Sequence, residues 1–215
     1  MPKGYEQNYQ QIVCKLADCD FEEAAPRLGL DPPTGGVVTV SFLGREYAIT
    51  STGVRATDGL PVHPNYLSSL VFYITSNGSG EPDDSYSLLH SFIPDKVGGV
   101  SNVSWMTSPL TREFGNDYGR FRDAMKALGA VPEESANGKE HIWSYRILPK
   151  IPMQVAYYEA DEEFPCEVKL KLNNSAGKFL EFEQLAFLCG CFISTLAPAA
   201  MPVPKAGCAV VRDLL

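Results

Sequence analysis

The stretch YYEADEEFPCEVKLKL, residues 157–172, predicts an antiparallel hairpin with an acidic connection. In its second half, Val168, Leu170 and Leu172 alternate with charged residues, as in a strand that has one face in solvent. The preceding residues, 151–158, include β-branched and aromatic side chains that favour a partner strand. The acidic residues therefore belong to the connection between two strands.

Two interpretations of this acidic connection are open. Its carboxylates are Glu159, Asp161, Glu162, Glu163 and Glu167. A structural turn predicts that Asp161 accepts backbone N–H bonds, that Phe164 fills the core, and that Glu159 and Glu162 point into solvent. The alternative is oxygen ligation of a hard cation. The stretch lacks the spaced Asp/Asn ladder and the glycine of a calcium loop, so we expect the solvated turn.

Apolar periodicity and turn residues divide the rest of the chain into helices and strands. Helices are predicted over 5–18, between Asp20 and Gly29, after caps at Asn65 and Asp117, and over 181–197. Two strands joined by a tight turn or a bulge at Gly44 are predicted over 37–50, and further strands over 142–148, 151–158 and 167–172.

Runs of strands that are separate from runs of helices favour an α+β fold. We expect a single α+β domain over 1–197 and a proline-rich tail over 198–215. All the predicted strands are placed in one mainly antiparallel sheet. The 181–197 helix is expected to pack on it through Leu185, Leu188, Phe192 and Ile193.

The charge balance excludes some partners. A formal net charge of −8 and a pI near 4.9 argue against nucleic acid and anionic membranes, because phosphate binding needs clustered positive charge. The sequence shows neither a secretory signal nor a run approaching the roughly 18 apolar residues of a membrane span. We therefore expect a cytoplasmic protein without a membrane partner. Its cysteines should then be thiols: Cys14, Cys19, Cys166, Cys189, Cys191 and Cys208.

The cysteines and histidines give little support for a metal site. Cys189 and Cys191 lie two apart on a predicted helix, so they point roughly 200° from each other and cannot both reach one metal. We expect no metal on these residues or on Cys14 and Cys19. His90, in SLLHSFI, is expected to be a hydrogen-bonded core histidine. No glycine loop for phosphate is present, so nucleotide-dependent chemistry has no support.

Three segments carry a family resemblance: FLGREYAI (42–49), SPLTREFGNDYGRFRDAMKALGA (108–130) and LPKIPMQVAYYEADEEFPCEVKLKLNNSAGKFLEFEQLAFL (148–188). Over most of residues 8–195, the chain resembles the domain-of-unknown-function family 3786 of anaerobic bacteria and archaea. The most specific piece is the D-E-E-F-P turn with the strand and NNSAGKFL after it, which marks Asp161 and Glu163 as shared features. The resemblance implies a context of corrinoid iron–sulfur proteins, although this chain lacks their four-cysteine module. It supplies no catalytic residues.

Two functions from different classes remain. The first is a non-catalytic binding or accessory protein in anaerobic one-carbon metabolism. The resemblance implies that it holds a corrinoid such as cobalamin, or a corrinoid or iron–sulfur protein. The candidate ligand-binding residues are Trp105, Tyr118, Phe121, Asp161 and Glu163.

The second function is a small hydrolase or transferase in which Asp161 and Glu163, with His141, act as acid and base. A hairpin end is poorly suited to separating the pKa values of two carboxylates. The binding function is therefore favoured, although the D-x-H-x-x-G signature of corrinoid domains is absent and any such binding needs another surface.

Overall fold

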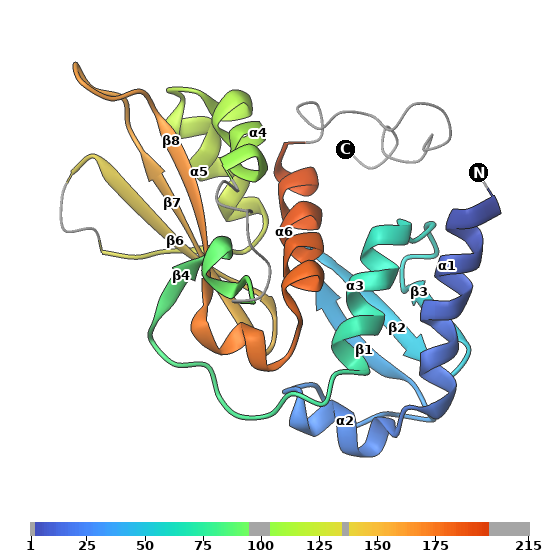
Figure 1. Cartoon of the computed structure of the whole chain (residues 1–215). Helices are drawn as coiled ribbons and strands as arrows, with labels where there is room; N and C mark the ends of the chain where they lie inside the picture. The colour runs from blue at the N-terminus through green and yellow to red at the C-terminus, as the bar shows by residue number, and fades with distance from the viewer. Residues whose placement is uncertain (1–2, 95–103, 135–137, 198–215) are drawn as a thin grey trace. The chain divides into compact units, whose positions relative to one another are not determined.

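The computed structural model describes residues 3–94, 104–134 and 138–197, with side chains over 9–94, 108–134 and 138–197. The described residues form two compact units. The first contains the residues up to Gly80 together with Lys178–Leu180, and the second contains Glu81–Gly177 and the residues from Glu181 on. Each unit combines helices with an antiparallel sheet, which confirms the predicted α+β class (Figure 1). The tail predicted over 198–215 lies outside the described residues, so that boundary stays a prediction.

The first unit is built on a three-stranded sheet of β1 (Val38–Phe42), β2 (Arg45–Thr50) and β3 (Gly53–Ala56). Alternate residues of β1 are buried, so one face of this sheet forms the core. The helices of the unit are α1 (Lys3–Cys14), the short 3-10 helix η1 (Lys15–Asp18), α2 (Phe21–Arg27) and α3 (Pro64–Ile74). Tyr66 of α3 meets Phe42 edge-on, with ring centroids 5.5 Å apart.

The helix caps follow the prediction in two cases and differ in one. Asp20 caps α2 and Asp117 caps α5 (Tyr118–Ala127), as predicted. The cap of α3 is His63 and not Asn65, because His63 Nδ1 accepts the backbone N–H of Asn65 at 3.2 Å. Pro64 explains the difference: a proline lacks an N–H and fits the first helical position, so the cap lies one residue before it.

The second unit contains a five-stranded sheet in the order β4-β8-β7-β6-β5. Its strands are β4 (Tyr86–Leu88), β5 (Val131–Pro132), β6 (Glu140–Leu148), β7 (Ile151–Tyr158) and β8 (Glu167–Asn173). The helices α4 (Ser104–Phe114), α5 and α6 (Phe182–Leu196) lie beside it in Figure 1, with the 3-10 helices η2 (Leu89–Phe92) and η3 (Asn174–Lys178). In the described residues, no helix is long and apolar enough to cross a membrane.

Helix α6 forms part of the core of the second unit, as predicted. Leu185, Leu188 and Phe192 are fully buried, and Ile193 is 1% exposed. The Phe192 ring lies 5.7 Å from the ring of Tyr145 on β6. The apolar residues of α6 therefore pack on the sheet that the hairpin β7–β8 helps to build.

The expectation of one sheet is wrong. Strand β2 pairs with β1 on one side and with β3 on the other, whereas the strands predicted over 142–148, 151–158 and 167–172 form the core of the other sheet. Alternation predicts which face of a strand is buried but not which strand it pairs with. Only the short connections, such as Leu43–Gly44, fix the pairing locally.

The prediction for His90 is also wrong. His90 is exposed in η2, while its neighbour Leu89 is 5% exposed. In this single 3-10 turn, Leu89 takes the inward position and the next side chain lies outside. The apolar neighbours of His90 in the sequence therefore misled the prediction.

Candidate functional site

The connection between β7 and β8 is a tightly hydrogen-bonded acidic turn. Asp161 Oδ1 accepts the backbone N–H groups of Glu163 at 3.0 Å and Phe164 at 2.9 Å. The Asp161 N–H donates to the Phe164 carbonyl at 2.9 Å, and Lys139 Nζ lies 3.2 Å from Asp161 Oδ2. This confirms the predicted role of Asp161. The hydrogen bonds from Phe164 and Glu163, with Lys139, hold the pKa of Asp161 below its usual value, so its carboxylate stays ionised near neutral pH.

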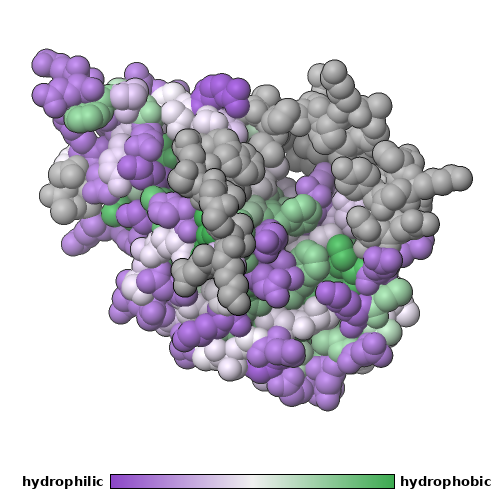
Figure 2. Space-filling view, viewed as in Figure 1, coloured by the Kyte–Doolittle hydropathy of each residue, from purple (hydrophilic) through white to green (hydrophobic). Residues whose placement is uncertain are grey.

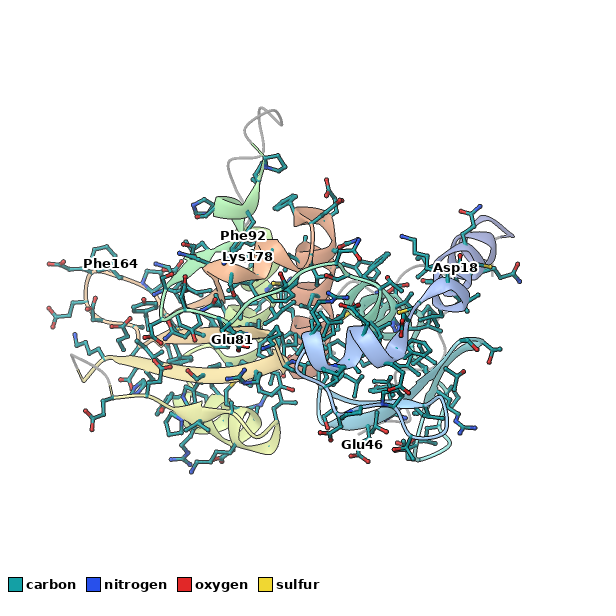
Figure 3. All side chains as sticks on the ribbon, turned by 90° about the horizontal axis from the view of Figure 1, so that it is seen from below. Asp18, Glu46, Glu81, Phe92, Phe164 and Lys178 are labelled. Carbon is teal, nitrogen blue, oxygen red and sulfur yellow. The ribbon has the colours of Figure 1, made fainter. Side chains whose placement is uncertain are left out.

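The aromatic residue of this turn lies in solvent. The prediction that Phe164 fills the core is wrong, because its side chain is 67% exposed. Phe164 lies at the outer end of the hairpin in Figure 3, and hydrophilic residues gather over that end in Figure 2. Cys166, two residues on, is only 7% exposed and takes the inward position where β8 begins.

A histidine–carboxylate pair lies beside this turn. His141 Nε2 and Glu159 Oε1 are 2.7 Å apart. The pairing of β6 with β7 places His141 opposite Tyr157, and the Glu159 N–H donates to the Lys139 carbonyl at 2.9 Å, which continues the ladder. Glu159 is exposed, as predicted, and it also pairs with His141. Glu162 is exposed and makes no hydrogen bond or ion pair with a described residue.

Tyr118 covers one face of the His141 ring. The two ring centroids lie 3.6 Å apart at an interplanar angle of 14°, which is a parallel stack. Tyr118 is the first residue of α5, and Asp117 fixes this end of the helix by accepting the Arg120 N–H at 2.9 Å. Both rings are half-buried, and the His141 side chain is 22% exposed.

A buried layer supports the stack. Phe121 is fully buried, and its ring lies 4.9 Å from Tyr157 and 5.3 Å from Phe114. The Tyr157 hydroxyl and the Cys166 thiol both donate to the Gly115 carbonyl at 2.7 Å. Burial raises the pKa of Tyr157 and the pKa of Cys166, so both groups stay protonated at neutral pH and neither is an activated nucleophile.

The five candidate residues fall in different environments. Tyr118 and Phe121 meet, with ring centroids 6.3 Å apart, but the buried Phe121 can only support a ligand surface. Trp105 lies in α4, and its side chain is outside the described side chains. Asp161 is engaged in its turn, and Glu163 is exposed and shares only a backbone bond with Asp161. Their role in binding stays a prediction.

Sequence reasoning missed the pairing of His141 with Glu159. The signal lay in the hairpin of β6 and β7, whose turn falls at Pro149 and Lys150. This signal is incomplete, because counting outward from the turn would place residue 141 opposite residue 158. The bulge between Arg146 and Leu148 shifts the register by one, so His141 lies opposite Tyr157 and the carboxylate of Glu159, two residues further on, comes within reach.

The contact with Glu159 uses one of the two ring nitrogens of His141. A carboxylate oxygen accepts hydrogen bonds, so in a neutral His141 ring that donates Nε2–H to Glu159 the lone pair is on Nδ1. Nδ1 makes no hydrogen bond with any described residue. In the parts of the chain that the structure describes, no group of three or more His, Cys, Asp or Glu residues is placed to hold a metal ion. The site therefore offers one imidazole and not a set of protein ligands that could surround a metal ion.

Comparison with known proteins gives a family and no activity. Searches of curated proteins and of solved structures found no match. A family model described as "Domain of unknown function (DUF3786)" matches residues 20–195. The match covers the acidic turn, the Tyr118–His141 stack and all but the last residue of α6, and the chain belongs to the DUF3786 family.

Proposed function

We propose that the protein is a non-catalytic binding protein that holds a corrinoid such as cobalamin, or a protein that carries one, at the Tyr118–His141 stack. The observation that carries this proposal is the 2.7 Å contact of His141 Nε2 with Glu159. A histidine that ligates a metal almost always donates its other N–H to a carboxylate, a carbonyl or water. His141 therefore has the support that a metal-ligating imidazole needs.

The number of available ligands favours a macrocycle over a bare ion. A metal ion held by protein alone needs three or four ligands in about the right geometry. Among the described residues no such group exists, and His141 has only Glu159 beside it. A corrinoid would bring most of the ligands of its cobalt with it, so the imidazole of His141 alone would be enough to supply the protein's ligand.

The stack on Tyr118 is compatible with this role. Imidazole ligates a metal in the plane of its ring, whereas Tyr118 lies 3.6 Å from the ring face. The stack therefore fixes the orientation of the ring without covering the direction in which Nδ1 bonds. The rings of Phe121 and Tyr157 also lie near Tyr118, with centroids 6.3 Å and 5.4 Å from it.

A titration with cobinamide, a corrinoid without a base of its own, tests the proposal. Under anaerobic conditions, the wild-type chain should shift the visible absorption of the corrinoid as imidazole coordination does. His141→Gln should abolish the shift, and Tyr118→Leu should weaken binding. His90→Gln is the matched control, because His90 is an exposed histidine of the same unit. An equal shift with His141→Gln contradicts the proposal.

An acid–base enzyme is the second candidate, and the same pair favours it. A histidine oriented by a carboxylate is the usual form of a general base. The pair first considered, Asp161 and Glu163, is less suited, because the lowered pKa of Asp161 makes it a poor acid. Hydrolysis of generic ester substrates that is lost in His141→Gln would favour this candidate over binding.

A further inference from the structure

The end of the β7–β8 hairpin exposes a large aromatic side chain on a fixed backbone. Phe164 is 67% exposed, more than the other large exposed apolar side chains of the described residues, Val131, Leu60 and Phe187. Its ring packs against no other aromatic ring described. Single exposed apolar residues are ordinary on a surface, so exposure alone does not identify a contact site.

The backbone around Phe164 distinguishes it from such residues. The Phe164 N–H donates to Asp161 Oδ1 at 2.9 Å, and the Phe164 carbonyl accepts the Asp161 N–H at 2.9 Å. Pro165 follows directly and restricts the next φ angle. The backbone of Phe164 is therefore held in place, so a partner that binds the ring has to order only the side-chain torsions.

The charges near this ring indicate the charge that a partner must carry. Glu162 and Glu163 directly precede Phe164, are exposed, and make no ion pair with a described residue. The cation nearest to this turn is Lys139, which directly precedes β6 and forms an ion pair with Asp161. A partner must therefore bring its own positive charge to the rim of the contact. A second copy of this chain fits poorly, because two chains of net charge −8 repel each other at long range.

We propose that Phe164 is the anchor of a protein–protein contact and that Glu162 and Glu163 form its charged rim. The partner is a different protein, with an apolar pocket large enough for a phenylalanine ring and with Lys or Arg residues around it. An aromatic anchor in a pocket, surrounded by polar contacts, is the usual arrangement of a binding hot spot. The proposal does not depend on a ligand at His141.

Photo-crosslinking can identify the partner. The full chain carries benzoylphenylalanine at position 164, or at position 187 as the control, and is irradiated in an extract of the source cells. Phe187 lies on α6 and is 36% exposed, so it reports contacts that any exposed phenylalanine makes. We expect a product that is specific to position 164. Crosslinks confined to the same chain or to a second copy, or no product beyond those of position 187, overturn the proposal.

The identified protein, purified, is then the probe in a titration. Phe164→Ala should weaken its binding about tenfold or more. The double change Glu162→Gln with Glu163→Gln should weaken binding and reduce its dependence on salt. Phe187→Ala should bind as the wild type does. Equal affinity of Phe164→Ala and wild type, with both folded by thermal melting, overturns the proposal.

Discussion

Two hairpins of this protein reverse the chain by different means. Between β1 and β2 the reversal takes Leu43 and Gly44, which have φ angles of 50° and 78°. Between β7 and β8 it takes residues 159–166 and the side chain of Asp161. Each connection carries one large apolar side chain, but Leu43 is 5% exposed and Phe164 is 67% exposed.

The difference shows that the construction of a turn determines whether its apolar side chain is buried or exposed. In the short turn, positive φ angles close the loop directly, and Leu43 stays next to the strands and their core. In the long connection, the carboxylate of Asp161 accepts the backbone N–H groups that have no partner on a neighbouring strand. The chain can then carry Phe164 away from the sheet. A turn held by a side chain is thus free to present a residue to solvent.

The largest expected effect comes from a buried phenylalanine of the same unit as Phe164. Phe192→Ala removes a fully buried ring that packs beside Tyr145, and should lower the free energy of unfolding by about 3–5 kcal/mol. Urea unfolding followed by circular dichroism measures this loss. An unchanged midpoint would mean that α6 does not contribute to the core.

The sequence predicted most of what depends on local pattern. The strands over 142–148, 151–158 and 167–172, the apolar helix α6 and the Asp161 turn were all predicted, because alternation, periodicity and capping are local properties. The short strands β3, β4 and β5 have too few residues to show a pattern.

The candidate site was less predictable because it depends on pairing. His141 and Glu159 are 18 residues apart and meet only through the register of β6 and β7. The turn was predicted with Phe164 in the core, whereas the structure leaves this side chain in solvent beside the hydrogen bonds of Asp161. Local chemistry predicted the turn and not the direction of its side chains.

The second prediction concerns the short turn itself. Leu43→Ala should cost about 2–3 kcal/mol, at the low end for a buried leucine, because the end of a hairpin can relax around the lost volume. Thermal unfolding of the variant beside Leu60→Ala, an exposed leucine of the same unit, measures the difference. A loss no larger than that of Leu60→Ala would show that Leu43 is not part of the core.

The third prediction tests a second side chain that accepts backbone N–H groups. His63 caps α3 only while Nδ1 is unprotonated, and burial lowers the pKa of His63. Because the folded-state pKa lies below that of the unfolded chain, the stabilisation is complete above about pH 6.5 and is lost as the pH falls through the folded-state value.

His63→Asn keeps a cap that does not titrate. Its free energy of unfolding should therefore fall less than that of the wild type between pH 7 and acid pH. The two decreases should differ by about 1 kcal/mol, the cost of a lost cap. Parallel pH slopes in the two proteins would show that the His63 cap is not the titrating group.

The fourth prediction weakens the turn that Asp161 holds. Asp161→Asn keeps an acceptor oxygen but removes the charge that strengthens the bonds from Glu163, Phe164 and Lys139. The melting temperature should fall slightly at pH 7. Because the pKa of Asp161 is lowered, its contribution is complete above about pH 3.9 and is lost as the pH falls through the folded-state pKa, so variant and wild type should converge in strong acid. Glu162→Gln is the control and should change little. A stabilised Asp161→Asn would show that repulsion among the carboxylates outweighs the hydrogen bonds.

The smallest expected effect on stability belongs to Phe164. Phe164→Ala removes a ring that is 67% exposed, so the free energy of unfolding should change by less than about 0.5 kcal/mol, the range of ordinary surface substitutions. The matched change Phe192→Ala should cost several times more under the same conditions, although both replace a phenylalanine in one unit. A cost of Phe164→Ala that approached that of Phe192→Ala would mean that the ring packs against the protein in solution. The hairpin end would then resemble the short turn at Leu43, and it would have no aromatic side chain free for a partner.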